Sequence, residues 1–292
     1  MASVAIAIVA YNSGALLRRC LAALGSRHAE VVVVDNASPD GQTAPACAEF
    51  AHVRLIERPR NDGFATAANA SVAATEAPWV LVLNPDAWPV GDGVEALLAR
   101  AQRDSRTGAV GPRLVDERGR LSRSTIRPPL SPAALALWVA APAALSRAYG
   151  VWRDATRRKG ADRVHAGEFL QASALLLRRE AFERVGGFDE SFFMYGEDAD
   201  LCARLRAAGW TIELCSDATF VHVGGGSSRA DVARMRVELL RSWLRLIAKR
   251  DGIARAERAR RWLRRSLRLR GERDAAAWAA SGAVDELLGL TE

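Results

Sequence analysis

The sequence lacks the long apolar run that a membrane-spanning helix needs. Such a helix takes about 18 or more consecutive apolar residues, and the longest apolar stretch, Leu130 to Leu145, is interrupted by Pro132 and Pro142. The run Val4 to Val9 is too short for a signal peptide and has no basic residues before it. We therefore expect a cytoplasmic protein.

Cysteine is scarce, and three well-known motifs are missing. The four cysteines contain no Cys-x-x-Cys pair, which argues against a disulfide framework or a thiolate zinc site and favours a reducing compartment. No Gly-x-Gly-x-x-Gly follows the first apolar run, and neither a P-loop nor a Gly-x-Ser-x-Gly motif occurs. These absences argue against a dinucleotide-dependent oxidoreductase, a P-loop nucleotide hydrolase and an α/β-hydrolase.

Positive charge is plentiful but confined to one region. The chain carries a net charge of +7, yet residues 229–273 alone hold 16 Arg and Lys against 5 Asp and Glu. The rest of the chain is therefore mildly acidic. A basic segment of this kind favours a polyanionic partner, either nucleic acid or an anionic membrane surface.

The first third of the chain alternates strand and helix patterns. Short apolar runs predict strands at Val4–Val9, Glu30–Val34, Val53–Ile56 and Trp79–Leu83. Helical periodicity predicts helices after Ser13 as N-cap to Gly25, at Phe64–Ala74 and at Gly93–Arg103. This order predicts an α/β fold with a mostly parallel sheet covered on both faces.

Polar residues follow three of these strands. In a parallel sheet, ligands bind beyond the carboxyl ends of the strands. The candidates are Tyr11 and Asn12, Asp35 and Asn36, and Asn84 and Asp86. Such residues also form ordinary turns, but three clusters together favour a ligand cleft.

The two segments beyond this body differ in character. Arg127 to Gly160 holds four prolines and an apolar stretch, which predicts a short helical hairpin or lid, or else an inserted loop. The basic segment carries apolar residues at helical spacing, including Trp243 and Trp262. We expect one of two arrangements. The segment packs on the strand-and-helix part of the chain with its arginines in water, or it forms an amphipathic basic surface that lies on anionic lipid.

The sequence also resembles the family 2 glycosyltransferases, in their bacterial rhamnosyltransferase-like branch. The matching segments occur in family order from residue 4 to about residue 228. They are Val9–Ser13, Val34–Ser38, Asn61–Ala65 with Asn69, Leu83–Asp86, Arg178–Phe182, Val185–Asp189, Phe193–Asp200 with Leu201, Arg204 and Gly209–Trp210, and His222. A single such segment is uninformative, whereas the ordered set is specific.

The resemblance implies a GT-A fold, a nucleotide-sugar donor and inversion at the transferred sugar. It implies that Asp35 contacts the base of the nucleotide and that Asp86 is the last acid of a metal-binding Asp-x-Asp motif. It further implies Asp198 as catalytic base and His222 as a metal ligand. The other residues expected around the nucleotide are Ala10, Tyr11, Asn12, Asn36, Asn61, Gly63, Phe64, Asn69 and Asn84.

Three positions depart from the family pattern. Asn84 replaces the first acid of the Asp-x-Asp motif, and Gln171 and Ser173 stand where an aromatic residue and a glycine are frequent. The last two positions border the acceptor side in the family, so the acceptor stays open.

The expected chemistry needs a cation and a base. A diphosphate leaving group gains negative charge, which Mg²⁺ or Mn²⁺ offsets with few protein ligands; an imidazole from His222 favours Mn²⁺. The alternatives are that Asp86 is a turn residue and that His222 ends a strand.

Glu197 and Asp198 begin a predicted helix, where the helix dipole also favours acids. We expect Asp198 to be the base and Glu197 to contact the acceptor.

The predicted protein is thus an inverting glycosyltransferase with a catalytic domain at 1–228 and a basic helical tail at 229–292. A uracil or thymine base suits Asp35, and dTDP-L-rhamnose is the first choice of donor. We expect a lipid-linked or glycan acceptor in cell-surface polysaccharide assembly, an anionic membrane surface as partner of the tail, and no nucleic acid. The oligomeric state stays open. The rivals are a sugar nucleotidyltransferase and a non-catalytic binding protein that uses the tail.

Overall fold

The computed structural model describes residues 4–28, 30–126, 168–224 and 232–269, with residues 131, 133–135, 164 and 271. The chain divides into two compact units. The first comprises Met1–Ile126, Gly150–Phe193 and Glu197–Ser227, and the second Arg127–Tyr149, Met194–Gly196 and Ser228–Glu292. Nearly all of the segment predicted to form a lid, Arg127 to Gly160, lies outside the described residues.

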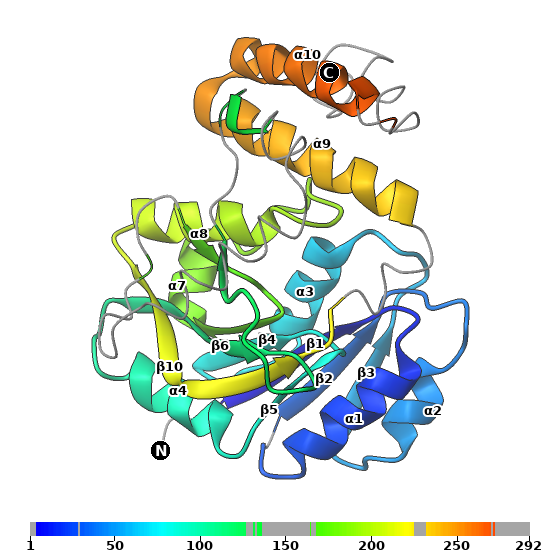
Figure 1. Cartoon of the computed structure of the whole chain (residues 1–292). Helices are drawn as coiled ribbons and strands as arrows, with labels where there is room; N and C mark the ends of the chain where they lie inside the picture. The colour runs from blue at the N-terminus through cyan, green and yellow to red at the C-terminus, as the bar shows by residue number, and fades with distance from the viewer. Residues whose placement is uncertain are drawn as a thin grey trace. The chain divides into compact units, whose positions relative to one another are not determined.

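The first unit is built on an eight-stranded sheet (Figure 1) with the order β3-β2-β1-β4-β9-β6-β10-β5. The strands are β1 (Val4–Ala10), β2 (Glu30–Asp35), β3 (Val53–Glu57), β4 (Trp79–Leu83), β5 (Ala87–Pro89), β6 (Thr107–Val115), β9 (Ala174–Arg178) and β10 (Thr211–His222). A separate two-stranded sheet pairs β7 (Thr125–Ile126) with β8 (Phe169–Leu170).

Most neighbouring strands in the large sheet run parallel. The pairs β3-β2, β2-β1, β1-β4 and β6-β10 are parallel, whereas β9 is antiparallel to β4 and β6, and β5 is antiparallel to β10. This confirms the predicted α/β class and the mostly parallel sheet. The antiparallel β9 brings its first residues beside the last residues of β4.

Helices cover both faces of this sheet, as predicted (Figure 1). They are α1 (Gly14–Leu24), α2 (Thr43–Ala48), α3 (Phe64–Ala73), α4 (Gly93–Ala101), α7 (Arg179–Arg184) and α8 (Glu197–Ala207). Helices α1, α2 and α4 share a core with one face, whereas α3 packs on β1 and β2 from the other. Buried alanines of α3, such as Ala65 and Ala68, keep that helix close to the strands.

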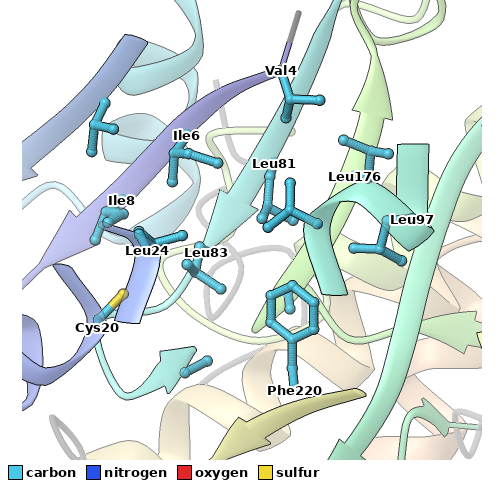
Figure 2. Packing of buried hydrophobic residues seen from close by; sticks show 14 of the residues in the cluster. Val4, Ile6, Ile8, Cys20, Leu24, Leu81, Leu83, Leu97, Leu176 and Phe220 are labelled. Carbon is cyan, nitrogen blue, oxygen red and sulfur yellow. The ribbon is translucent and has the colours of Figure 1, made fainter. Parts of the chain in front are cut away.

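The alternation of side chains along each strand explains the apolar runs. Ile6 and Ile8 of β1 lie with Leu81 and Leu83 of β4 in the core that α1 and α4 complete (Figure 2). The intervening residues are also buried, because helices cover the second face as well. Strands apolar at every position are therefore expected.

Helix α1 begins and ends where the sequence predicted. Ser13 is its N-cap residue, but it makes no side-chain capping hydrogen bond, and its Oγ is a buried atom without a partner among the described residues. Gly25 ends α1 as predicted, with φ of 62° and its N–H donating to Leu21 O at 3.1 Å.

The described part of the second unit includes the helices α9 (Val232–Asp251) and α10 (Ile253–Leu269), which pack on each other. They are joined at Gly252, whose φ of 87° suits a residue without a Cβ. This agrees with the helical spacing of the basic segment. Among the described residues, no helix has the length and apolar character needed to cross a bilayer.

Candidate functional site

The sheet register brings the predicted strand-end residues to one edge. Ala10 of β1 lies opposite Asp35 of β2, and Leu83 at the end of β4 lies opposite Ala174 of β9. His222 of β10 lies opposite Ala87, the residue after Asp86. Asp86 and His222, which are far apart in the sequence, therefore meet at this edge of the sheet.

Asp35 is buried at the end of β2 and is held by a fixed set of donors. Its Oδ1 accepts hydrogen bonds from Ser38 N at 3.2 Å, Ser38 Oγ at 2.5 Å and Thr43 Oγ1 at 3.1 Å. Ser38 Oγ also accepts from Asn12 N at 3.0 Å. All three of these donors bind the same oxygen of Asp35, so Oδ2 keeps its capacity to accept a hydrogen bond from a ligand.

The turns after β1 and β2 adopt backbone conformations that are rare for residues with a side chain. Asn12 has φ of 49° and Ala37 has φ of 61°. Asparagine tolerates this region, whereas alanine pays a steric penalty there, which the surrounding contacts must offset. Tyr11 and Asn12 are half-buried in the first of these turns, beside Ser38 of the second.

Asn36 joins the end of β2 to the start of α3. Its Nδ2 donates to Asn61 Oδ1 at 2.8 Å and to Gly63 O at 3.0 Å, and Asn61 Oδ1 also accepts from Gly63 N at 3.0 Å. Asn36 Oδ1 is buried and has no partner among the described residues. A buried acceptor without a partner is costly, so this oxygen marks a position where a ligand donor fits.

Gly63 brings the start of α3 against the segment that precedes α8. Its φ is 95°, and a Cβ at this position would lie 2.3 Å from Phe193 O. The neighbouring Phe64 N donates to the same carbonyl at 2.7 Å. No other residue type fits here without a shift of the backbone, which explains the glycine.

The amide of Asn69 is fully engaged with protein groups. Its Nδ2 donates to Phe188 O and to Glu190 Oε1, both at 2.9 Å, and its Oδ1 accepts from Phe188 N at 2.9 Å. Asn69 therefore fixes the loop around Phe188 to α3. In the structure it acts as a brace within the first unit.

Asp86 and His222 form a close pair at the ends of β4 and β10. His222 Nε2 lies 3.4 Å from Asp86 Oδ1, and both side chains are largely buried. The backbone fixes this approach, because Val223 N donates to Asp86 O at 3.0 Å. Asn84, half-buried, is held by its backbone N–H to Ser173 O at 2.9 Å.

This pair suits a cation that takes most of its ligands from a substrate. No cluster of three or more His, Cys, Asp or Glu side chains occurs among the described residues. Mg²⁺ and Mn²⁺ bind to nucleotide diphosphates with one or two protein side chains, and the remaining ligands are phosphate oxygens and water. One carboxylate and one imidazole therefore fit such an ion, and they do not form a complete cage.

Asp198 lies in the first turn of α8 and faces the start of β9. Its Oδ2 accepts from Ala172 N at 3.4 Å, and its Oδ1 accepts from Ala199 N at 2.8 Å. Ala172 adjoins Ser173, whose carbonyl binds Asn84 N. Asp198 is thereby connected to the β4 end, two residues from Asp86.

The three acids in this first turn have different environments. Glu197 is buried, and burial followed by the charge of Asp198 raises its pKa well above the usual range. Asp200 is paired with Arg204 at 2.6 Å, and Arg204 also donates to Val185 O. Burial therefore favours the neutral form of Glu197, whereas Asp200 is engaged in an ion pair within α8.

Two buried oxygens beside Asp198 lack partners among the described residues. They are Glu197 Oε2 and Ser173 Oγ. Gln171, two residues before Ser173, directs its amide to Arg123 O. Polar atoms of this kind at one edge are suited to the hydroxyl groups of a bound sugar.

Several contributing residues were not assigned by sequence reasoning. Ser38 and Thr43 orient Asp35, and Arg58 donates its backbone N–H to Asp35 O at 2.9 Å. Arg58 also pairs with Asp62 at 2.9 Å, and this hydrogen bond is the main cause that lowers the pKa of Asp62. Ser38 lay inside a matching segment, but Thr43 and Arg58 carried no comparable signal.

Comparison with protein families identifies the class of transferase to which this fold belongs. Residues 5–186 match the model of Glycosyl transferase family 2, and residues 165–223 match that of the N-terminal domain of galactosyltransferase. The first match covers more than half of the chain, which therefore belongs to glycosyltransferase family 2.

Individual relatives sharpen this assignment. The chain is 35% identical over 253 residues to the N-acetylglucosaminyl-diphospho-decaprenol L-rhamnosyltransferase of Mycobacterium tuberculosis, with 78% of each chain covered. It is 32% identical over 83 residues to rhamnosyltransferase WbbL of Escherichia coli, covering 28% of this chain and 31% of that one. The chain is thus a rhamnosyltransferase-like family 2 glycosyltransferase.

Solved structures confirm the GT-A fold. A mannosyltransferase from Pyrobaculum calidifontis, in complex with GDP-Man and Mn²⁺, has a TM-score of 0.60 and 21% identity. The match covers 98% of this chain and 78% of that chain. GalNAc-T7 with UDP, GalNAc and Mn²⁺ has a TM-score of 0.58 and 16% identity, covering 85% of this chain and 48% of that one.

Proposed function

We propose that this glycosyltransferase moves L-rhamnose from dTDP-L-rhamnose to a hydroxyl of a lipid-linked sugar, with inversion at the transferred carbon. The observation that carries this proposal is the close pair of Asp86 and His222, together with Asp198, which is linked to the same strand end through Ala172, Ser173 and Asn84. The M. tuberculosis relative, named for a decaprenol-diphosphate-linked N-acetylglucosamine acceptor, supports the rhamnosyl donor and the class of acceptor.

The base of the donor is selected at Asp35. Its Oδ1 is saturated by Ser38 and Thr43, and its second oxygen accepts the N3–H of a thymine or uracil ring. Cytosine has no hydrogen at this nitrogen, so CDP donors are disfavoured. The turns at Ala10–Asn12 and at Asn61–Phe64 flank this contact, and UDP sugars are the alternative donors.

Asp86 and His222 would hold Mn²⁺ or Mg²⁺ against the diphosphate. When bound, the ion offsets the charge that develops on the leaving diphosphate. The imidazole favours Mn²⁺, and Asn84 adds a neutral oxygen at the same turn. Both solved neighbours named above were crystallised with Mn²⁺.

Asp198 is the base. The acceptor hydroxyl forms a bond to the anomeric carbon while the bond from that carbon to the diphosphate oxygen breaks, and dTDP leaves with the electron pair. The acceptor proton passes to Asp198. Neutral Glu197 donates a hydrogen bond to the acceptor, because burial keeps its proton in place.

We place the reaction in cell-surface glycan assembly, on the cytoplasmic side of a membrane, with residues 1–228 as catalytic domain and residues 229–292 as basic tail. A lipid-linked acceptor is found at a bilayer, and the basic tail gives the enzyme a means to remain there. No nucleic-acid partner is proposed.

A nucleotide panel tests the donor half of the proposal. Thermal shifts are measured with dTDP, UDP, GDP and CDP, with and without Mn²⁺, since a ligand that binds only the native state raises the melting temperature. We expect dTDP or UDP with Mn²⁺ to give the largest shift. The proposal fails if CDP or GDP stabilises the chain more strongly, or if Mn²⁺ adds nothing to any nucleotide.

A further inference from the structure

Both helices of the basic segment contribute buried side chains. Leu240, Trp243, Leu244 and Ile247 of α9 are buried, as are Ala256, Ala259, Leu263 and Leu267 of α10. Every residue of α9 from 242 to 248 is buried, whereas the buried residues of α10 recur at intervals of three and four and therefore share one side of that helix. Trp243, which the sequence grouped with Trp262, is therefore not available to an external partner.

The opposite side of α10 is a stripe of arginines around a tryptophan. We call it the arginine face; its exposed members are Arg258, Arg261, Trp262, Arg265, Arg268 and Leu269. They also recur at intervals of three and four residues, so they share one side of the helix. Trp262 is 54% exposed and Leu269 is 90% exposed, so both apolar side chains lie among the arginines of this side.

The charges of the arginine face are not neutralised within the described part of the chain. Two other arginines of α10 are paired: Arg255 with Asp251 at 3.1 Å, and Arg260 with Glu257 at 3.0 Å. None of the four arginines on the arginine face has a carboxylate partner among the described residues. The face therefore presents four positive charges along about 15 Å of helix.

We propose that the arginine face of α10 is the surface by which the enzyme binds an anionic lipid bilayer. A straight stripe of arginines matches the plane of anionic headgroups, and each contributes to binding. Trp262 has the amphipathic ring that is favoured at the membrane interface. The phosphates of a nucleic acid would pair with the arginines but would make no use of the exposed apolar side chain of Leu269.

This inference deepens the proposed function, because a lipid-linked acceptor gives the binding its purpose. Bound at the bilayer, the enzyme encounters that acceptor at a raised effective concentration. Helix α10 would lie in the interface plane without crossing the bilayer.

Vesicle co-sedimentation of the full chain tests the arginine face. The variant Arg258→Gln/Arg261→Gln/Arg265→Gln is compared with Arg103→Gln/Arg118→Gln/Arg184→Gln, which removes the same charge from exposed arginines of the first unit. Vesicles are made with and without phosphatidylglycerol. Each arginine near such a surface changes affinity roughly fivefold, so the α10 variant loses on the order of 100-fold. The control loses only severalfold.

Salt and tryptophan provide a second, independent readout. Added salt weakens the arginine contribution steeply, since exposed charges are screened over about 8 Å at physiological ionic strength. Lipids brominated in the upper acyl chain quench the fluorescence of wild-type protein. The quenched component disappears in Trp262→Phe and persists in the control Trp88→Phe.

Three outcomes overturn the inference. The first is that the full chain does not bind anionic vesicles at low salt. The second is that both triple variants weaken vesicle binding equally. The third is that the α10 triple variant loses binding to a DNA duplex while its vesicle binding is unchanged. Thermal shift with dTDP is measured on every variant. The arginine face contributes nothing to donor binding, so the two proposals can fail separately. A normal melting-temperature shift with dTDP but no vesicle binding refutes the arginine face as a membrane-binding surface. Vesicle binding without any shift by nucleotide refutes the proposed transferase site.

Discussion

The acidic side chains of the first unit and the arginines of α10 differ in how much water reaches them. Asp35, Asp86, Glu197 and Asp198 are buried to at least nine-tenths, and each lies at the end of a strand or in the first turn of a helix. The arginine face is exposed along its whole length. The two sets of ionisable side chains therefore behave differently.

A buried charge acts over a few ångströms and resists salt, whereas an exposed one acts as part of a field and is screened. Burial therefore suits the acids to chemistry on a single bond, where protonation state and position decide the rate. Exposure suits the arginines to a partner that is itself extended and charged. If burial governs the acids in this way, changing a buried acid should alter turnover or stability more than changing an exposed one.

Asp198→Asn is expected to have the largest effect. Turnover should fall by about 10²-fold or more, as for loss of a general base, while the thermal shift with dTDP stays close to wild type. Steady-state kinetics of sugar transfer measure this, with the exposed Asp217→Asn as control. If the Asn variant keeps near wild-type turnover, Asp198 has no part in proton transfer; if Glu197→Gln alone is inactive, the base is Glu197.

Gly63→Ala tests the backbone contact that positions the loop before α8. A Cβ would lie 2.3 Å from Phe193 O, so unfolding free energy should fall by about 3 kcal/mol or more. Gly119→Ala has a similar φ of 73° and nothing within 4 Å of the added Cβ, so it should lose only about 1 kcal/mol. Urea denaturation compares the two, and equal losses would show that the Phe193 contact is unimportant.

The pH dependence of Glu197→Gln gives a smaller effect. The raised pKa of Glu197 means that the folded state keeps a proton which the unfolded state releases. Wild-type stability contributed by this group is therefore present below the unfolded pKa near 4.3 and is lost as pH rises towards the folded pKa. The stability of the Gln variant relative to wild type should then increase with pH, by at most about 1.4 kcal/mol per pH unit.

Urea denaturation across the pH range from acidic to neutral measures this difference. The exposed Glu180→Gln serves as control and should follow wild type at every pH. A pH-independent difference for Glu197→Gln would mean that Glu197 is already ionised in the folded protein, and its role as a neutral donor would be excluded.

The sequence predicted the first part of the fold well, because strands β1, β2 and β4 are apolar on both faces and end in polar residues. It predicted no antiparallel β9, since the orientation of Ala174–Arg178 depends on which neighbours the strand meets. The same limit applies to Thr43, which orients Asp35 from eight residues away. Such contacts arise from packing and leave no periodic pattern.

The sequence was also limited in what it could predict about the second unit. Helical spacing predicted α9 and α10, but two tryptophans in one amphipathic segment looked equivalent. In the structure Trp243 is buried and Trp262 is 54% exposed, a difference that helical spacing alone does not predict. Ser13 was correctly expected as the N-cap of α1, but residue type alone does not show whether its hydroxyl makes a capping hydrogen bond.

The most direct test of the proposed cation-assisted, inverting transfer is the NMR spectrum of the product formed from dTDP-L-rhamnose and a diphospholipid-linked N-acetylglucosamine, with Mn²⁺ and after exhaustive chelation with EDTA. We expect a rhamnoside whose anomeric configuration is opposite to that of the donor, formed with Mn²⁺ and not after chelation. A retained configuration, or full product formation in EDTA, would contradict a single displacement assisted by a cation at Asp86 and His222.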